Sequence, residues 1–335
     1  MINKLPLISI VITSFNRANW IGRAIQSALD QDYKNLEIII SDNNSTDNTD
    51  EVVRSFCSDS RIKYYRNETN IGMIENFKKA TYELATGEYI TYISSDDYLC
   101  NNNFVSHAVA LILKYANIIL AVSKCSTFSN NNDTLLEDDN SHMFVEEFRL
   151  GTDCFQLYPF KIALGWGGVL MNRQKLIDSN ALFSKAQSLD IEANLKLMLQ
   201  GNIAFIKIPC YAFRLHDAQA SSTMKNEAFI DNLDYIENTY TFAKTKKLDF
   251  DLEEWRREVY IYYVSGIARK MINKKEEFKK LLYNIKHIKK VELNFFKYPK
   301  LGILYLIYKN YNNVSWILKL ILPKVYQSIE NDKLI

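Results

Sequence analysis

The chain has 335 residues, of which 47% are hydrophobic and 24% are charged, and its net charge is only +2. These values match an ordinary soluble protein that is long enough to bury a core in one large or two modest domains. Its five cysteines are scattered and never occur as C-x-x-C, which argues against a disulfide framework or a zinc site. No N-terminal stretch has the order of charged, apolar and small residues of a signal peptide, so we expect a cytoplasmic protein.

The first hundred residues alternate between short, nearly continuous apolar runs and amphipathic segments. The runs are typical of strands that are buried on both faces of a parallel sheet. We expect strands at 7–13, 36–40, 62–65 and 89–93, and helices at 20–29, from a cap at Ser45 or Thr46 towards Phe56, and at 74–84. This alternation predicts an α/β fold, a doubly wound sheet with helices on both faces.

The rest of the chain is less regular. We expect helices at 103–115 and 190–199, strands at 118–122, 169–171 and 203–208, and an Asn/Asp-rich loop at 129–140. After about residue 226 the pattern becomes a Lys- and Tyr-rich helical one. The predicted organisation is therefore an α/β segment at 1–105, a less regular segment at 106–225, and a helical basic region at 226–335.

Polar side chains follow the four N-terminal strands at the points where the strands end. The four groups are Thr13-Ser14-Phe15-Asn16-Arg17, Ser41-Asp42, Asn70-Ile71-Gly72 and Ser94-Ser95-Asp96-Asp97. Parallel strands bring their carboxyl ends to one edge of the sheet, where ligands bind. Hydroxyls, a cation and carboxylates on one edge predict a nucleoside diphosphate site with a divalent cation. The chain lacks G-x-G-x-x-G after the first strand and has no P-loop motif, which argues against both of those nucleotide-binding modes.

Five ordered blocks in this region resemble family 2 glycosyltransferases with the GT-A fold, in particular those of bacterial O-antigen and capsule polysaccharides. The blocks are Ile8 to Arg17, Gln31-Asp32-Tyr33, Glu37 to Asp47, Asn70-Ile71-Gly72, and Gly87-Glu88-Tyr89 leading into Ser94 to Asp97. The resemblance is strong over about the first 105 residues and continues more weakly to about residue 222. It implies a Rossmann-like, mostly parallel central sheet flanked by helices, here with a helical C-terminal extension. It also implies that 1–105 is the half that binds the nucleotide sugar and that 106–225 is the half that binds the acceptor.

The resemblance also implies roles for individual residues. The implied nucleotide-binding residues are Thr13, Ser14, Asn16, Arg17, Asp42, Asn70 and Asp96, with Asp42 accepting a hydrogen bond from the base. The implied ligands of Mn²⁺ or Mg²⁺ are Asp97, Asp96 and His216, with Asp97 as the expected direct ligand. Many family members read Asp-x-Asp-Asp where this chain begins with Ser94, which leaves the division of ribose and metal contacts between Asp96 and Asp97 open.

The general base of the implied reaction is expected in the second half of the chain. The segment from Ser188 to Leu197 resembles the family's Glu-Asp followed by an amphipathic helix, which implies that Asp190 is the catalytic base. Leu189 replaces the usual Glu, so Glu192 is an alternative base, and Asp190 could instead only cap its helix. Trp166, in the sequence Gly165-Trp166-Gly167-Gly168, fits an acceptor-sugar contact and core packing equally well.

The C-terminal region is strongly basic. Between Arg269 and Lys324 there are fourteen basic residues and three acidic ones, mixed with large apolar side chains. The apolar run at 301–308 is too short to span a bilayer, which takes about 20 residues. The composition fits an anionic membrane surface, at the cytoplasmic face of the inner membrane, and it equally fits a solvated helical face. No nucleic-acid motif accompanies these charges, so we expect no nucleic-acid partner.

Together these observations predict an inverting, metal-dependent glycosyltransferase. It would move a sugar from a nucleoside diphosphate sugar, with a UDP-sugar favoured, to a hydroxyl of a lipid-linked glycan. Two alternatives are a nucleotidyltransferase of similar fold and a non-catalytic protein that binds a sugar nucleotide or carbohydrate. The sequence does not specify the sugar, the acceptor, the linkage or the oligomeric state.

Overall fold

The computed structural model describes residues 5–129, 132–137, 141–159, 161–162, 164–184, 186, 188–216, 226–268 and 275–293. The chain divides into two compact units, Met1–Phe250 and Asp251–Ile335. The first unit contains a mixed α/β fold built on one large sheet, and the described part of the second unit is helical. All five cysteines are free, in agreement with the sequence.

The described residues of the first unit contain one sheet of ten strands, in the order β3-β2-β1-β4-β9-β6-β10-β5, with β7 paired to β6 and β8 paired to β10. The pairs β2–β3, β1–β2, β1–β4 and β6–β10 are parallel, and β9 is antiparallel to both β4 and β6. The strands are β1 Ile8–Ser14, β2 Leu36–Asp42, β3 Ile62–Arg66, β4 Tyr89–Ser94, β5 Tyr98–Leu99, β6 Ile118–Ser129, β7 Asn132–Glu137, β8 Phe148–Arg149, β9 Val169–Asn172 and β10 Asn202–Leu215.

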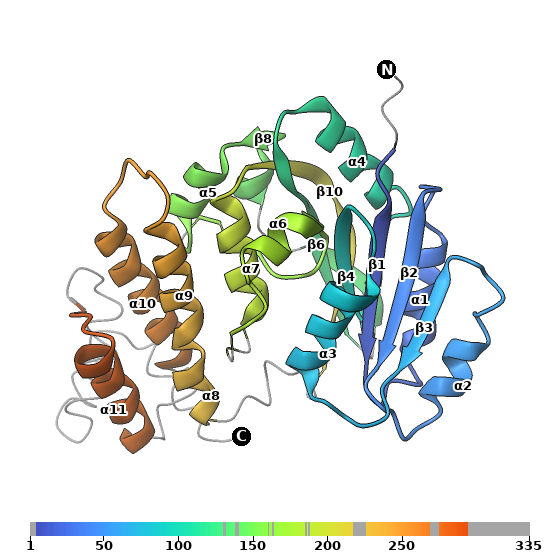
Figure 1. Ribbon diagram of the computed structural model, residues 1–335, viewed down its shortest axis with the longest axis horizontal. Helices are drawn as coiled ribbons and strands as arrows, with labels where there is room; N and C mark the ends of the chain where they lie inside the picture. The colour runs from blue at the N-terminus through green and yellow to red at the C-terminus, as the bar shows by residue number, and fades with distance from the viewer. Residues whose placement is uncertain are drawn as a thin grey trace. The chain divides into compact units, whose positions relative to one another are not determined.

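Helices cover both faces of this sheet, with α1 behind it and α3 in front of it in Figure 1. The helices of the first unit are α1 Ile21–Leu29, α2 Thr49–Arg54, α3 Met73–Lys79, α4 Phe104–Lys114, α5 Gly151–Leu157, α6 Arg173–Asp178, α7 Leu189–Met198, α8 Asn226–Asp231 and α9 Leu233–Ala243. Helix α3 continues into a π-helical turn, Ala80–Leu84, and a short 3₁₀ turn spans Ser141–Phe144. The doubly wound arrangement predicted from the alternating pattern is confirmed.

The apolar runs form strands because both of their faces are covered. Every residue of β2 is buried, and in β1 only Thr13 is partly exposed. Isoleucines of these two strands pack into one core cluster with the apolar face of α1, including Ile21 and Ile25. Burial on both faces removes the alternation of a half-exposed strand, so the core fixes β1 and β2 side by side and aligns their C-terminal ends.

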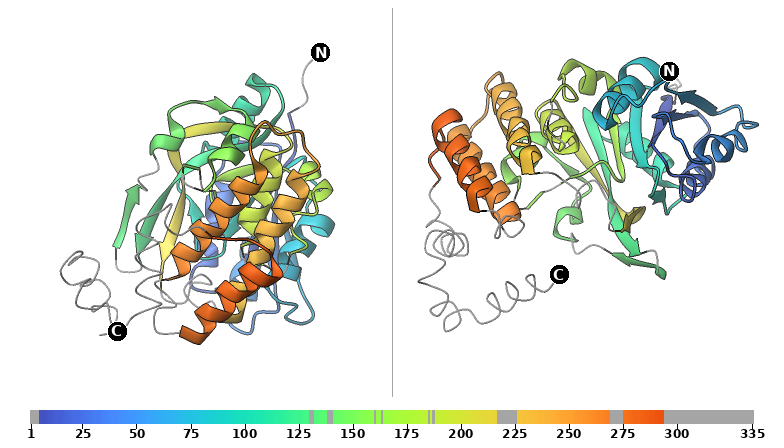
Figure 2. Two further views of the ribbon diagram at one scale, coloured as in Figure 1. Left: turned by 90° about the vertical axis from the view of Figure 1, so that its left-hand side faces the viewer. Right: turned by 90° about the horizontal axis from the view of Figure 1, so that it is seen from below.

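Several elements differ from the sequence-based expectation. The predicted loop at 129–140 contains strand β7, which pairs with the end of β6, and Figure 2 shows both at a projecting end of the sheet. Strands β6 and β10 extend well past 122 and 208 because they pair with each other along that extension. Helix α2 begins after Asn48, so neither Ser45 nor Thr46 caps it; both lie in the loop before the helix.

The second unit contains α10 Leu252–Ala268 and α11 Lys275–Tyr283, which is followed by a π-helical turn at Asn284–Ile288. Asp251 begins α10, where its carboxylate accepts the backbone N–H groups of Glu253 and Glu254 at 2.9 and 3.0 Å. The second unit starts after Phe250. Helix α9 is joined to α7 within the first unit, since Asn232 and Asn238 bond to Ser188 and Glu192. The predicted division of the chain at residues 105 and 225 stays a prediction.

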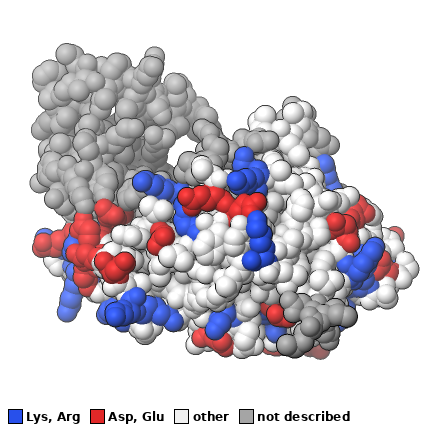
Figure 3. Space-filling view, turned by 90° about the horizontal axis from the view of Figure 1, so that it is seen from above, with Lys and Arg blue, Asp and Glu red and all other residues white. Residues whose placement is uncertain are grey.

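Charge on the described surface is mixed. Figure 3 shows acidic and basic side chains interspersed on the face seen from above, in keeping with the small net charge. Of the predicted basic tail, residues 269–274 and 294–324 lie outside the described residues. Among the described helices, none combines the length and apolar character that crossing a bilayer needs.

Candidate active site

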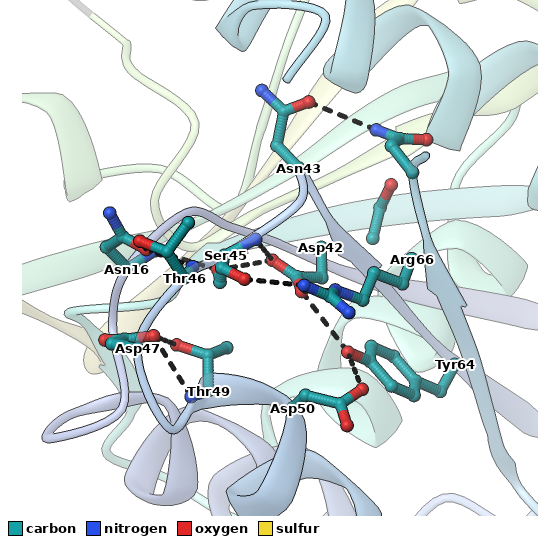
Figure 4. A network of polar contacts seen from close by, with 12 residues as sticks. Asn16, Asp42, Asn43, Ser45, Thr46, Asp47, Thr49, Asp50, Tyr64 and Arg66 are labelled. Atoms are coloured by element: carbon teal, nitrogen blue, oxygen red, sulfur yellow. Dashed lines mark hydrogen bonds and ion pairs between the residues drawn. The ribbon is translucent and has the colours of Figure 1, made fainter. Parts of the chain in front are cut away.

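The loops that follow β1 and β2 are fastened to each other, as Figure 4 shows. Asn16 has a φ of 53°, a left-handed conformation that asparagine tolerates better than most residues. In that conformation its backbone N–H donates to the hydroxyl of Ser45 at 2.9 Å, and its side-chain oxygen accepts the N–H of Thr46 at 2.8 Å. Next to it, the N–H of Arg17 donates to the hydroxyl of Thr49 at 2.9 Å. These bonds hold Arg17, which follows β1, beside the loop that follows β2.

Asp42 lies at the centre of this network and is completely buried. One carboxylate oxygen accepts the N–H of Ser45 at 3.1 Å and also the Ser45 hydroxyl. The other oxygen faces the hydroxyl of Tyr64 at 3.3 Å and the Nε of Arg66 at 3.4 Å. Both oxygens therefore have partners within the protein. The expected contact of Asp42 with a nucleotide base stays a prediction, and it requires one of these partners to give way.

Other strand-end residues are arranged around the same edge. Asn70 accepts hydrogen bonds from the side chain of Asn43 at 2.8 Å and from the N–H of Gly72 at 2.9 Å, so it shapes the loop before α3. Thr13 is partly exposed, whereas Ser14 is buried and its hydroxyl has no hydrogen-bond partner among the described residues. A buried hydroxyl without a partner is rare in folded proteins and leaves a polar atom available at the strand end.

The adjacent acids Asp96 and Asp97 have different surroundings. Asp97 is 3% exposed, and its two oxygens accept the Tyr211 hydroxyl at 2.7 Å and the backbone N–H of Arg214 at 2.8 Å. Burial raises its pKa to about 7, although the Arg214 N–H lowers it. Asp96 instead faces the Nε2 of His216 at 2.9 Å and the Nε of Arg17 at 3.8 Å. Asp97 thus joins the turn after β4 to β10, whereas Asp96 lies next to Arg17 and His216.

The indole of Trp20 contacts Arg17, Arg214 and His216. The indole of Trp20 lies 4.9 Å from the His216 ring, measured between centroids. The guanidinium carbons of Arg17 and Arg214 lie 5.4 and 5.5 Å from the same indole. Contacts of this kind hold cations in place over an aromatic face. The predicted residues Arg17, Asp96 and His216 are therefore brought together, and Arg214 joins them.

Asp190 is the second residue of α7 and so lies in the first turn of that helix. It is partly buried, and burial raises the pKa of its carboxyl group to about 6, even though the N–H groups of Ile191 and of Asp190 itself lower it. A Cβ atom on Gly165 would lie 3.4 Å from its Oδ2, so the carboxylate closely approaches the glycine-rich loop before β9. A carboxyl group with a raised pKa suits proton transfer near neutral pH.

Glu192, the alternative base, has a different environment. It is 1% exposed and forms an ion pair of 2.7 Å with Lys196, one turn further along α7. Asn238 of α9 donates to its other oxygen at 3.3 Å. Burial raises the pKa of Glu192, and Lys196 opposes that effect. Glu192 thus belongs to the packing of α7 on α9, whereas Asp190 approaches the loop at the sheet edge.

Sequence reasoning did not single out Tyr211 or Asn194. Tyr211 was outside the expected strand at 203–208, which was ended too early at Pro209. Asn194 lies on α7 and donates to the backbone carbonyls of Leu164 and Gly165 at 3.2 and 3.0 Å. A buried asparagine inside a helical pattern is a signal for such a backbone contact, because a buried amide needs partners.

A glycosyltransferase of the GT-A class is the type of protein that this fold and edge of polar groups define. The chain belongs to glycosyl transferase family 2, because the model of that family matches residues 9–180. This finding confirms the predicted enzyme class and fold over the nucleotidyltransferase and non-catalytic alternatives.

Curated relatives are similar to about a third of this chain. A GalNAc(5)-diNAcBac-PP-undecaprenol beta-1,3-glucosyltransferase of Campylobacter jejuni is 36% identical over 114 residues, which cover 34% of this chain and 35% of the relative. An Escherichia coli UDP-Glc:alpha-D-GlcNAc-diphosphoundecaprenol beta-1,3-glucosyltransferase, WfaP, is 38% identical over 94 residues, which cover 28% of this chain and 37% of the relative. The match spans about a third of the length of each of these two relatives.

Solved structures extend the likeness over most of the chain. TarS 1–349 of Staphylococcus aureus, in complex with UDP-GlcNAc, is similar with a TM-score of 0.70 at 18% identity, over 92% of this chain and 89% of that chain. A mannosyltransferase of Pyrobaculum calidifontis, in complex with GDP-Man and Mn²⁺, is similar with a TM-score of 0.53 at 14% identity, over 97% and 83% of the two chains. At these identities the likeness establishes the fold.

Proposed function

We propose that this protein transfers a sugar from a nucleoside diphosphate sugar, with a UDP-sugar favoured, to a hydroxyl of a lipid-linked glycan, with inversion at the anomeric carbon. The observation that carries the proposal is that two acids, Asp96 and Asp190, have different surroundings. Asp96 faces Arg17 and His216 at the sheet edge, and Asp190, with its raised pKa, lies by the loop before β9. The first group suits a diphosphate and the second suits an attacking hydroxyl.

The donor end of the site is formed by the strand ends. Arg17, Arg214 and His216 contact Trp20, and the two guanidinium groups would balance the charge of the donor diphosphate. The unpaired Ser14 hydroxyl and the partly exposed Thr13 supply further polar groups for the nucleotide. Asn16, Asp42 and Asn70 support these residues by fixing the loops around them.

A divalent cation, Mn²⁺ or Mg²⁺, fits this end of the site. No cluster of three His, Cys, Asp or Glu side chains that could hold a metal occurs among the described residues, but such ions are commonly held by one or two carboxylates plus substrate phosphates. Asp96 and His216 offer a carboxylate and an imidazole that face each other, and we assign the ion to them rather than to Asp97, whose oxygens are both engaged. When bound, the ion would neutralise charge on the diphosphate.

The chemistry proposed for the protein is a single displacement. Asp190 accepts the proton of the acceptor hydroxyl as that oxygen forms a bond to the anomeric carbon. The bond between the anomeric carbon and the diphosphate breaks, and its electron pair leaves with the nucleoside diphosphate. Arg17 and Arg214 stabilise the departing charge, since both already lie at that strand edge.

The acceptor class is proposed from the relatives. Two of them are named for action on undecaprenol-linked glycans, and the match to this chain spans about a third of each. We therefore propose that the protein acts at the cytoplasmic face of the inner membrane. Membrane contact through 269–324 stays a prediction of the sequence, because most of that segment is outside the described residues.

Donor binding tests the proposal. The full chain is titrated with UDP, GDP, dTDP and CMP, each with and without Mn²⁺, and stabilisation is followed by calorimetry or thermal shift. We expect one nucleoside diphosphate, UDP before the others, to stabilise the protein more strongly with Mn²⁺. Asp96→Asn should remove the Mn²⁺-dependent part, whereas Asp178→Asn, at an exposed position of α6, should not. If none of the four nucleotides stabilised the protein with or without Mn²⁺, the donor assignment would be wrong.

A further inference from the structure

The loop Gly165-Trp166-Gly167-Gly168, called here the 165–168 loop, lies between Asp190 and strand β10. A Cβ atom on Gly165 would lie 3.4 Å from the Asp190 carboxylate, and one on Gly167 would lie 2.7 Å from the Tyr211 ring. Gly168 has a φ of 67°, and a Cβ there would lie 2.3 Å from the Ser123 hydroxyl. The glycines let the backbone approach both neighbours closely. Trp166 is therefore the one side chain that this loop presents.

The backbone of the 165–168 loop is held from both ends. Asn194 donates to the carbonyls of Leu164 and Gly165 at 3.2 and 3.0 Å. At the other end, the N–H of Ser123 donates to the carbonyl of Gly168 at 2.8 Å. These bonds come from a buried helix and a buried strand, so the position of Trp166 is set by rigid elements rather than by the loop alone.

Trp166 packs against an aromatic wall but is not enclosed by it. The Phe77 ring stacks on the indole with centroids 5.9 Å apart and an angle of 15° between the planes. The Tyr92 ring lies 4.6 Å away at 52°. Phe77 and Tyr92 are both buried, whereas Trp166 remains partly exposed. Part of the indole is thus exposed directly beside Gly165, the residue that approaches the Asp190 carboxylate.

We propose that Trp166 is the platform on which the sugar ring of the acceptor rests, with the reacting hydroxyl directed at Asp190. This inference rests on the proposed function. The apolar C–H face of a pyranose packs on a flat aromatic ring, while its hydroxyl groups project from the ring edge and remain free to bond. Gly165 adjoins Trp166 and also lies close to Asp190. The proposal therefore places the reacting edge of a sugar on the indole towards that carboxylate.

The assignment makes Trp166 a specificity-determining residue for the acceptor and leaves donor binding to the strand ends. Substitution of Trp166 should therefore weaken binding of the acceptor and leave binding of the donor unchanged. A purely structural role predicts a different result, because loss of the contact with Phe77 and Tyr92 would disturb β4, which leads into Asp96, and would impair both substrates together.

The experiment compares Trp166→Ala and Trp166→Phe with the wild type. The donor is a sugar ester of the nucleoside diphosphate that stabilises the protein most in the titration above, and the acceptor probe is N-acetylglucosaminyl diphosphate on a farnesyl chain, offered in detergent. Three quantities are measured: the acceptor KM, the Kd of the donor nucleotide, and the slow hydrolysis of the donor in the absence of acceptor. Phe183→Ala serves as the control, since Phe183 is an aromatic residue with 60% exposure that contacts Tyr82 instead.

We expect Trp166→Ala to raise the acceptor KM at least about tenfold, and Trp166→Phe to raise it less, while nucleotide Kd and donor hydrolysis stay within about twofold. An unchanged acceptor KM in both variants, or a parallel loss of donor and acceptor binding in Trp166→Phe, would overturn the inference. If the wild type transferred the sugar and both Trp166 variants had the same acceptor KM, only the role of Trp166 would be refuted and the proposed function would stand. Absence of nucleotide binding in the wild type would instead refute the proposed function.

Discussion

Replacement of Asp190 by Asn tests the base assignment through stability as well as activity. Burial raises the pKa of this carboxyl group to about 6 from an ordinary value of 3.8. The folded protein therefore binds the proton more tightly than the unfolded chain does, and ionisation of Asp190 opposes folding. This penalty is absent below about pH 4, grows between pH 4 and 6, and is complete above pH 6, where about two pKa units correspond to about 3 kcal/mol.

The amide that Asp190→Asn introduces does not titrate, so the two proteins should diverge as the pH rises. We expect Asp190→Asn to gain about 1–1.5 kcal/mol over the wild type between pH 5 and pH 8, because about half of the penalty is already present at pH 5. Urea unfolding at both pH values measures this difference. The comparison between two pH values removes any constant cost of burying the amide.

Activity should change in the opposite direction. Loss of the general base should lower kcat by about 10²- to 10⁴-fold, with the Kd of the donor nucleotide unchanged. In the wild type, kcat/KM should fall as the pH drops below about 6, because Asp190 then carries a proton. Asp178→Asn is the matched control for both measurements. A stability difference that did not vary with pH, or transfer at the wild-type rate, would refute the reasoning.

Two further predictions concern the buried polar groups that support the site. Tyr211→Phe removes the hydroxyl that donates to Asp97, so we expect a loss of about 1–3 kcal/mol in thermal or urea unfolding and a higher donor KM; unchanged values of both would contradict the role given to this bond. Lys196→Met leaves the Glu192 carboxylate buried without its ion-pair partner, which should cost about 3–5 kcal/mol at pH 8 and less at pH 5, where protonation relieves the unpaired charge. The double variant with Glu192→Gln should recover most of this loss, and failure to recover it would argue that the pair itself is not the cause.

The N-terminal half of the fold could be predicted because its signals are local. Strands β1, β2 and β4 are buried on both faces, so their apolar runs stand out, and the polar strand ends mark one edge of the sheet. Strands β7 and β10 are harder to predict from the sequence. The extension of β10 contains Pro209 and alternates between exposed Phe213 and buried Arg214, and it is stabilised by pairing with β6 rather than by its own pattern.

The candidate site shows the same limit. The motif identifies Asp96 and Asp97 as a pair, but the difference between them comes from residues more than a hundred positions away. Tyr211 and the Arg214 N–H engage both oxygens of Asp97, and His216 engages Asp96. Such pairings depend on the register between strand β10 and the turn after β4, which no local pattern specifies.

The bonds between the loops after β1 and β2 have a consequence for the thermodynamics of substrate binding. Asn16, Ser45, Thr46 and Thr49 join these loops before any substrate arrives. A nucleotide bound at these strand ends, as proposed above, would meet a surface whose conformational entropy has largely been lost during folding, so its association would cost little further freedom of the chain. Affinity for the donor can then be high with few direct contacts, and changes in these four side chains would act mainly by increasing the ordering cost of binding.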